Sequence, residues 1–385
     1  MAAHALRIEK QDAIRSVKDV AASTSSQVPF ATSLYLLNAF IRAQPIGEDI
    51  VFPDEGFDFA LFCHRHKLMQ ALADGVSYEA EQHASLDLIA PVFRHVAEET
   101  RAHNDAVFQE LRELLFSLRR ITLPPVLLNG TALMVMQNGR ADNWFRADNI
   151  ELLIGTHELE ASIYALAHLG YEPRSTDYDF RRDAQYPVLR KPDGAAGISF
   201  YTQPIEMDLK ALLAADEVRA RALGVQVDGR EVFSASPEDR LISLVSRSMI
   251  LEKGYQSHSV LLCGALEYLD IVSRHDVPID LICEHFSAAG YAEHFEAFVC
   301  CLGLIWGDLV SYPDWCRVGE AWAEKVFEKL ETKSFWQGSI EGDWKRILHN
   351  ELSGQTGLVH LFNGIRRAGG RSSFAQVPQL TRLAS

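Results

Sequence analysis

Asn149, Glu151 and Asp208 carry side-chain oxygens of the types that bind divalent cations. Asn149 and Glu151 stand two residues apart in the segment 149–154, and Asp208 stands in the alternating segment 205–210. Because residues two apart in a strand point to the same face of a sheet, each segment would present its polar side chains together. Mg²⁺ prefers hard oxygen ligands of this kind. The spacing therefore predicts a metal site formed by Asn149, Glu151 and Asp208.

A tight turn precedes the first of these segments. The apolar run 126–128 suits a buried strand, and Asn129, Gly130 and Thr131 follow it before a helix that we expect over 132–137. Gly130 permits the turn, and backbone N–H groups with a small hydroxyl would then approach phosphate oxygens. Two divalent cations beside such a turn serve nucleotidyl transfer, because they hold the triphosphate and neutralise the leaving pyrophosphate. The expected ligands are a nucleoside triphosphate and Mg²⁺.

Charged residues close to these positions complete the candidate site. Arg146 precedes the strand 149–154 and would either contact a phosphate with two parallel hydrogen bonds or lie at the surface where the strand begins. Lys210 lies beside Asp208 on the polar face of its segment, where it would either pair with the carboxylates of the site and supply positive charge or form only an ion pair at the strand end. We expect Glu151, Asp208 and Lys210 to take part in catalysis.

Helical patterns stand on both sides of this segment in the sequence. Apolar residues recur at steps of three and four over much of 28–120, and especially over 87–119. The segment 158–169 has the same spacing and ends at Gly170, which favours a helix cap. Later, Ser236 followed by Pro237 is a typical helix start, and helical spacing continues beyond it.

Strand patterns fill the middle of the chain. The segments 186–190 and 198–201 predict a hairpin across a glycine turn, and the alternation over 205–210 predicts a further strand. We therefore expect an α+β fold, in which a small mixed β-sheet carries the site and helical regions flank it. The expected parts are an N-terminal helical region at 1–120, an α/β core at 121–215, a C-terminal helical region at 216–368 and an irregular tail at 369–385.

Composition narrows the class of partner. The 385 residues carry a formal net charge of −15, which disfavours a nucleic-acid groove as the main working surface. No segment reaches the ~20 apolar residues of a membrane helix, and residues 1–26 lack the apolar core of a signal peptide. We therefore expect a cytoplasmic protein with no membrane partner. The six cysteines form no C-x-x-C pair, which favours reduced thiols over a zinc site.

Five short motifs carry a family resemblance. They are Leu127-Leu-Asn-Gly-Thr-Ala-Leu133, Arg146-Ala-Asp-Asn-Ile-Glu-Leu-Leu-Ile154, Leu169-Gly-Tyr171, Met207-Asp-Leu-Lys210 and Ser236-Pro-Glu-Asp-Arg-Leu-Ile242. In this order they resemble an uncharacterised bacterial nucleotidyltransferase family of the DNA polymerase β-like fold, often encoded beside biosynthesis genes. The family pattern is L-K-G-x-A-L, then R-x-x-x-D-I-D-L-L-V, then L-G-Y and D-L-H. The resemblance covers about 64–307, including a helix with His103 and Asn104, and implies a small-molecule or peptide acceptor for the nucleotidyl group.

Departures from that pattern fall on its polar positions. Asn129 replaces the family lysine, Asn149 and Glu151 replace the aspartate pair, Lys210 replaces a histidine, and Arg247 stands where a later histidine is expected. Such changes are expected where a scaffold is kept while catalysis is relaxed or altered.

One neighbouring carboxylate could restore part of the loss. Asn149 brings an amide oxygen but no charge, which weakens a two-metal site. A β-bulge at the strand start would turn Asp148 toward the site, whereas without a bulge Asp148 faces away.

Three functions are consistent with these residues. The first is active transfer of a nucleoside monophosphate from a nucleoside triphosphate to a small molecule or peptide. The second is a catalytically degenerate nucleotidyltransferase that acts as a binding or scaffold protein for a peptide or a biosynthetic partner protein. The third is altered, metal-independent chemistry in the same cleft, using Lys210 or Glu206.

Overall fold

In this computed structural model the chain divides into two compact units, Met1–Glu331 and Thr332–Ser385. The structure describes residues 36, 37, 40, 59, 62, 63, 66–81, 86, 89–118, 123–136, 145–175, 177–179, 182–227, 229–306, 321–326 and 328, all in the first unit. The expected tail at 369–385 lies outside the described residues.

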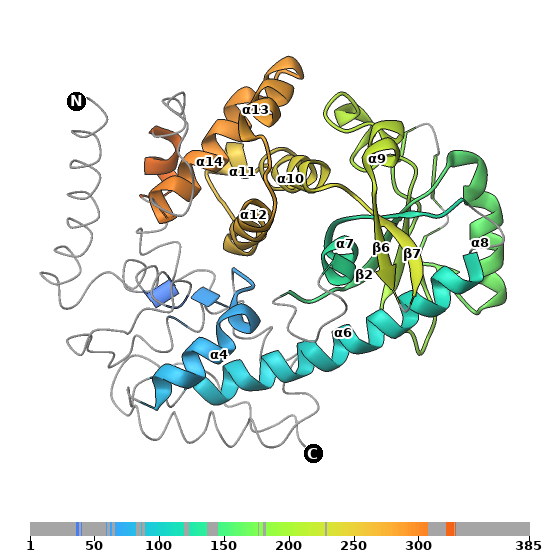
Figure 1. Ribbon diagram of the computed structural model, residues 1–385, viewed down its shortest axis with the longest axis horizontal. Helices are drawn as coiled ribbons and strands as arrows, with labels where there is room; N and C mark the ends of the chain where they lie inside the picture. The colour runs from blue at the N-terminus through green and yellow to red at the C-terminus, as the bar shows by residue number, and fades with distance from the viewer. Residues whose placement is uncertain are drawn as a thin grey trace, which may run out of the picture. The chain divides into compact units, whose positions relative to one another are not determined.

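The described residues form an α+β fold, as the sequence predicts. A seven-stranded mixed sheet stands between helices that come before and after it in the chain (Figure 1). The strand order across the sheet is β3-β4-β5-β2-β1-β7-β6. The strands are β1 (Val126–Leu127), β2 (Asn149–Leu153), β3 (Glu172–Pro173), β4 (Leu189–Arg190), β5 (Gly197–Tyr201), β6 (Leu223–Val227) and β7 (Arg230–Ser234).

Strand pairing explains why the central strands are apolar. Strand β2 pairs in parallel with β5 and antiparallel with β1, and β1 pairs in parallel with β7. Strands with a neighbour on each side and helices packed against them are buried on both faces, which favours continuous apolar runs. The predicted strands at 126–128 and 149–154 are thereby confirmed. The predicted hairpin is also confirmed, because β4 pairs antiparallel with β5.

The predicted strand at 205–210 is wrong. These residues form a 3₁₀ turn, η2 (Met207–Leu209), with hydrogen bonds from Leu209 N to Glu206 O and from Lys210 N to Met207 O. Ile205 and Leu209 are buried while the polar residues between and after them are exposed, so a local turn produces the same alternation that a strand would. The sheet gains two strands from elsewhere, because β6 and β7 lie beyond residue 215, in a segment expected to be helical.

The described helices agree with the predicted periodicity. Those before and within the sheet region are α4 (Met69–Ala80), α6 (Ala90–Leu118), α7 (Asn129–Met136) and α8 (Leu159–His168), which follows a 3₁₀ turn, η1 (Thr156–Glu158). Those after it are α9 (Ala215–Arg221), α10 (Pro237–Val245), α11 (Gly254–Ser257), α12 (Leu262–Arg274), α13 (Ile279–Ala288) and α14 (Ala292–Trp306). Between α10 and α11 lies a π-helical segment, η3 (Ser246–Leu251). The predicted start of α10 is confirmed, because the Ser236 hydroxyl accepts a hydrogen bond from Asp239 N at 3.1 Å.

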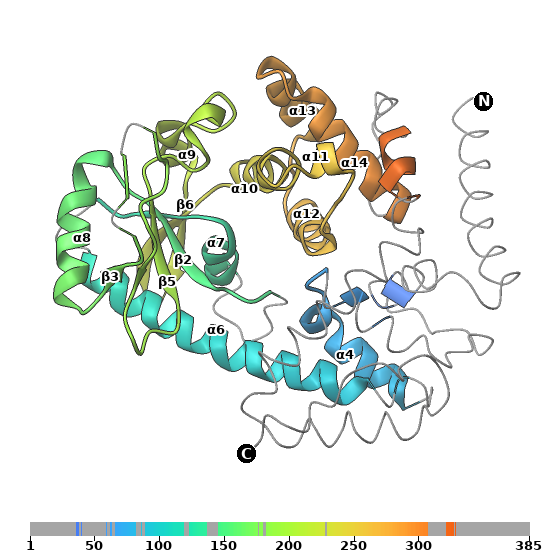
Figure 2. The same ribbon diagram turned by 180° about the vertical axis from the view of Figure 1, so that it is seen from behind.

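Helix α6 lies beside α4 at its N-terminal end and reaches the sheet at its C-terminal end, as the two views show (Figure 2). Val107, Leu111 and Leu114 on its apolar face are buried in the same hydrophobic cluster as Ile150 of β2 and Phe200 of β5. Apolar residues at steps of three and four therefore do what the sequence predicts, which is to bury one stripe of the helix against the core.

Two polar side chains of α6 fix the strands that matter for the site. Asn104 donates a hydrogen bond to Phe145 O at 2.7 Å and accepts one from Ala147 N at 3.0 Å, which holds the segment that enters β2. Glu110 accepts hydrogen bonds from Ala195 N at 2.8 Å and from the next backbone N–H, which holds the loop that enters β5. The Asn104 amide and the Glu110 carboxylate satisfy backbone hydrogen-bonding groups of these segments, so the starts of β2 and β5 are both fixed to α6.

Two further predictions concern the membrane and the thiols. None of the described helices is long and apolar enough to cross a membrane. The cysteines Cys63, Cys263, Cys283 and Cys301 are free thiols, as expected, whereas Cys300 is disulfide-bonded, contrary to that expectation.

Candidate functional site

The two polar residues of β2 face a strand that carries no acidic side chain. In the parallel pairing of β2 with β5, Asn149 lies opposite Gly197 and Glu151 lies opposite Ser199. A side chain at Gly197 would place its Cβ 2.5 Å from Asn149 Oδ1, so only glycine leaves room for the amide there. The position beside Glu151 that would hold a third carboxylate is therefore occupied by a buried hydroxyl.

The predicted third carboxylate lies elsewhere. Asp208 is exposed on η2, and it makes no hydrogen bond or ion pair with the described residues. Glu206, at the start of the same turn, acts electrostatically on Tyr201, the last residue of β5. The structure thus does not bring Asp208 together with Glu151 by any described contact, and its role as a metal ligand stays a prediction.

Glu151 is bound by an arginine and a tyrosine. Its Oε1 accepts a hydrogen bond from Tyr201 Oη at 3.0 Å and one from Arg247 Nη2 at 3.4 Å. The Glu151 side chain is 12% exposed, against 41% for Arg247, so this ion pair stands at the edge of the core rather than inside it. A cation from the C-terminal helices therefore meets the carboxylate that was expected to bind Mg²⁺.

The Glu151 carboxylate shifts the pKa values of both Tyr201 and Arg247. Burial raises the pKa of Tyr201 well above its usual value, and the Glu151 carboxylate raises it further, while Arg247 acts in the opposite direction. The phenol therefore stays protonated and donates to Glu151. Burial is the largest influence on the pKa of Arg247 and lowers it, but Glu151, Tyr201 and Glu252 together hold the pKa of the guanidinium above its usual value.

Asn149 is bound by a second arginine. Arg190 of β4 donates from Nη2 to Asn149 Oδ1 at 3.4 Å. Its Nε is buried and has no hydrogen-bond partner among the described residues. Each of the two strand residues expected to hold a divalent cation therefore has its side-chain oxygen bound by a guanidinium.

The π-helical segment η3 determines where Arg247 points. Glu252 N donates to Arg247 O at 2.9 Å. This hydrogen bond spans five residues instead of the four of an α-helix, so the turn is wider. Gly254 packs against this segment so closely that a Cβ there would lie 2.4 Å from Ser248 O, a backbone atom. Such π-helical bulges are frequent at functional sites, and this one presents the arginine to Glu151.

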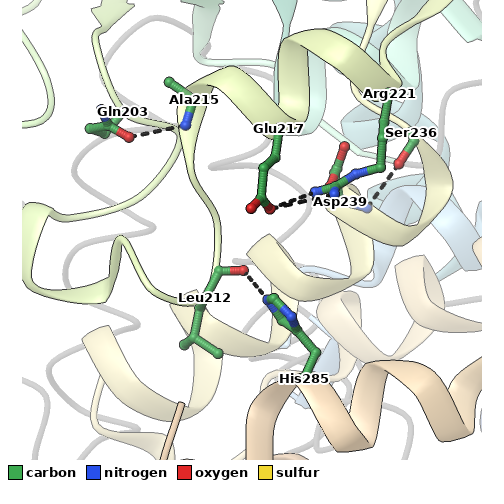
Figure 3. Close-up of polar contacts among 8 residues, drawn as sticks. All are labelled: Gln203, Leu212, Ala215, Glu217, Arg221, Ser236, Asp239 and His285. Carbon is green, nitrogen blue, oxygen red and sulfur yellow. Dashed lines mark hydrogen bonds and ion pairs between the residues drawn. The ribbon is translucent and has the colours of Figure 1, made fainter. Parts of the chain in front are cut away.

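Helix α10, which leads into η3, is fixed to the segment after η2 (Figure 3). Arg221 at the end of α9 donates from Nη2 to the buried Asp239 carboxylate of α10 at 2.7 Å. On α13, His285 hydrogen-bonds the carbonyl of Leu212. Gln203 accepts from Ala215 N at 3.1 Å and so holds the start of α9. These contacts hold α10 and α13 against the segment 203–221, which follows β5.

The predicted phosphate turn has a structural role in this conformation. Helix α7 starts at Asn129, whose φ is +45°, so the left-handed residue is the asparagine and the expected tight turn at Gly130 is wrong. Thr131 Oγ1 accepts from Glu151 N at 2.8 Å and donates to Asn149 O at 3.4 Å. Its hydroxyl is buried and occupied by β2, so Thr131 anchors the strand.

Asn129 connects α7 to α10. Its Oδ1 accepts a hydrogen bond from Ser243 Oγ at 2.9 Å, while its Nδ2 is buried without a partner among the described residues. The prediction that Asn129, Gly130 and Thr131 contact a nucleotide is not tested by these contacts and stays a prediction.

The remaining predicted residues lie at the surface. Arg146 Nε pairs with Asp148 Oδ1 at 3.3 Å, and both side chains are more than half exposed. The β2–β5 register runs without interruption from Asn149 onward, so no bulge turns Asp148 into the site. Lys210 is exposed at the end of η2, and its side chain makes no hydrogen bond or ion pair with the described residues.

These contacts test whether the residues present fit a two-metal centre. Among the described residues, no group of three or more His, Cys, Asp or Glu side chains is arranged to hold a metal ion. Asn149 brings no charge, and the Glu151 carboxylate is balanced by Arg247. Two dications need several anionic oxygens, so this donor set does not fit them.

Sequence reasoning missed most of the partners at this site. No motif in the sequence marks Arg190 or Tyr201, and Arg247 stands out only as a departure from the family histidine. The alternation Gly197, Ser199, Tyr201 along β5 was a usable signal, because it shows a polar and aromatic face without an acid.

The chain was compared with models of protein families, with curated proteins and with solved structures, and none of these comparisons finds a match. What the structure establishes is the α+β fold with its mixed sheet, and the geometry around Asn149 and Glu151.

Proposed function

We propose that this protein is a degenerate nucleotidyltransferase-like protein that binds a ligand or partner at the former catalytic face and does not carry out two-metal nucleotidyl transfer. The observation that carries this proposal is the pair of arginines, because Arg190 binds Asn149 and Arg247 binds Glu151. The family resemblance supplies the nucleotidyltransferase-like part of the proposal, and the order of strand β1, helix α7 and strand β2 is consistent with it.

The electrostatics support loss of metal chemistry. A two-metal mechanism places two dications between carboxylates, and the metal charge stabilises the pyrophosphate that leaves. Here one carboxylate, Glu151, is available on β2, and it already carries an ion pair. An incoming Mg²⁺ would have to displace the Arg247 guanidinium and would then find a neutral amide and a hydroxyl as its other close oxygens. Binding of the metal would therefore cost the ion pair and gain few anionic contacts.

The partner follows from the same reasoning. Residues of η3 and α10 contact Glu151 of β2 and Asn129 of α7, so a ligand bound at this face would affect the C-terminal helices. Together with the resemblance, this favours a small molecule, a peptide or a biosynthetic partner protein as the bound species. The formal net charge of −15 opposes nucleic acid as a partner.

Calorimetric titration tests the proposal. Purified protein is titrated with ATP, GTP, CTP and UTP, each with Mg²⁺ and with EDTA, beside the Glu151→Ala/Asp208→Ala double variant. We expect that Mg²⁺ strengthens the binding of none of the four nucleotides, either in the wild type or in the double variant. Binding that requires Mg²⁺ and disappears in the double variant would contradict the proposal and favour an active transferase.

A further inference from the structure

The two arginines use little of their hydrogen-bonding capacity on the strand residues. Each makes a single hydrogen bond of 3.4 Å, Arg190 to Asn149 and Arg247 to Glu151, which is at the long end of the range for such bonds. A guanidinium has five N–H donors in a planar fork. Among the described residues, Arg190 Nε is buried without a partner, and Nη2 is the atom of Arg247 that forms a hydrogen bond. Arg247, whose side chain is 41% exposed, therefore keeps most of its donors open to a ligand, and Arg190 has a donor that no described residue satisfies.

The spacing of the two arginines suits a ligand with two negative centres. Their partners are two residues apart on one face of β2, so the Cα atoms of Asn149 and Glu151 are about 7 Å apart along the strand. Arg190 comes from β4 and Arg247 from η3. A ligand lying over Asn149 and Glu151 would therefore meet the Arg190 guanidinium beside Asn149 and the Arg247 guanidinium beside Glu151. Tyr201 donates its single O–H to Glu151, so the donors that face a ligand come from the two arginines.

Acidic residues near Arg247 oppose the binding of an anionic ligand there. Glu252 raises the pKa of Arg247, and Glu267 lies close enough for Arg247 to act on its pKa. Glu267 is paired with the buried Arg240, at 3.5 Å between Oε1 and Nη2. The carboxylate that an incoming anion would meet most directly is therefore Glu151.

We propose that Arg190 and Arg247 bind a diphosphate group directly, without a metal ion. This inference rests on the proposed function, because it takes the arginines as the replacement for the metal ions. Guanidinium forks match phosphate oxygens bidentately, and charge-assisted hydrogen bonds are about twice as strong as neutral ones. A diphosphate presents oxygens on two phosphorus atoms and can engage both forks, whereas a single carboxylate fills only one.

Titration with inorganic pyrophosphate in EDTA tests this inference. The wild type is compared with Arg190→Gln and Arg247→Gln, and with Arg274→Gln as the matched control, because Arg274 is an exposed arginine on α12 paired with Asp270. Acetate is titrated as the carboxylate probe, and ATP in EDTA distinguishes a nucleotide from a free diphosphate. Circular dichroism of each variant checks that it is folded.

We expect pyrophosphate to bind in EDTA, and the Kd to rise about tenfold or more in each of the two site variants while the control keeps the wild-type value. Added salt should weaken this binding. Three results would overturn the inference: equal binding of acetate, pyrophosphate binding that both site variants retain, or no pyrophosphate binding by folded wild type.

The failure of this inference can be told apart from failure of the proposed function. Absence of pyrophosphate binding, both in EDTA and with Mg²⁺, overturns the inference and leaves the loss of metal chemistry standing. Binding that occurs only with Mg²⁺ and disappears in Glu151→Ala overturns both.

Discussion

Replacing Glu151 by glutamine separates a metal site from a site based on arginine, because the two predict effects of opposite sign. Glutamine keeps the size of the side chain and an oxygen that can accept hydrogen bonds from Tyr201 and Arg247, which lie at 3.0 and 3.4 Å in the wild type. The substitution therefore removes one negative charge with little change of shape. If Arg247 binds an anion, the charge lost was repelling that anion.

Coulomb's law gives the size of the effect. A ligand oxygen on the far side of the Arg247 guanidinium lies about 6 Å from the Glu151 carboxylate, and a unit charge at that distance costs about 0.7 kcal/mol in water and about 3 kcal/mol at an effective dielectric constant of about 20. The Glu151 side chain is 12% exposed, so an intermediate value is appropriate. We therefore expect Glu151→Gln to bind pyrophosphate in EDTA about tenfold more tightly than the wild type.

The assay is calorimetric titration near neutral pH at low ionic strength, with Glu217→Gln as the matched control. Glu217 lies on α9, is more than half exposed and pairs with Arg221. The control should bind like the wild type. Weaker pyrophosphate binding by folded Glu151→Gln would refute the reasoning, because it would mean that the carboxylate helps the anion to bind, as a metal ligand does.

Three further predictions follow from single contacts. Thr131→Val should lower the free energy of unfolding, measured by urea denaturation, by about 1–3 kcal/mol, because it leaves the Glu151 N–H without its acceptor. It should leave pyrophosphate binding unchanged. An unchanged stability would argue against the anchoring role of Thr131. Gly254→Ala should destabilise the protein and weaken pyrophosphate binding, because its Cβ would lie 2.4 Å from Ser248 O and would displace η3; thermal unfolding and titration check both, and a variant with wild-type melting would contradict the close packing. Burial raises the pKa of Cys263 to about 11 from 9.0, so the native thiol keeps its proton at pH values where the unfolded thiol loses it. This contribution to stability is present below pH 9.0 and lost as pH rises through about 11. The rate of alkylation of Cys263, measured against pH, should show the same raised pKa, and an ordinary thiol titration would contradict it.

The sequence predicted the elements whose signals are local. Strands β1 and β2 follow from short apolar runs bounded by turn residues, and α6 follows from its apolar stripe. The start of α10 follows from Ser236 and Pro237, where capping chemistry involves only a few neighbouring residues.

The failures share a physical cause, which is that alternation alone does not identify a strand. The segment 205–210 buries Ile205 and Leu209 as predicted, but its hydrogen bonds close locally within η2. Strands β6 and β7 were missed even though Gly229, with φ +73°, forms a turn between them. Pairing with other strands decides such cases, and a single sequence does not display it.

The site itself depends on contacts between distant parts of the chain. Asn149 and Glu151 were recognised as the central polar pair from their spacing, and the structure places both on β2 as expected. Their partners come from 41 and 96 residues away, at Arg190 and Arg247. Only the strand order and the widened turn of η3 bring those arginines to β2, so residue types and local spacing favoured a metal where the fold supplies guanidinium groups.

Titration with Mn²⁺, followed by the loss of its free-ion electron paramagnetic resonance signal, tests the central claim most directly. Mn²⁺ takes the same oxygen ligands as Mg²⁺ and is observed without any nucleotide or acceptor. We expect wild type and Glu151→Gln to deplete free Mn²⁺ equally and weakly, because Arg247 already balances the carboxylate. Stoichiometric binding of Mn²⁺ by the wild type that disappears in Glu151→Gln would contradict it.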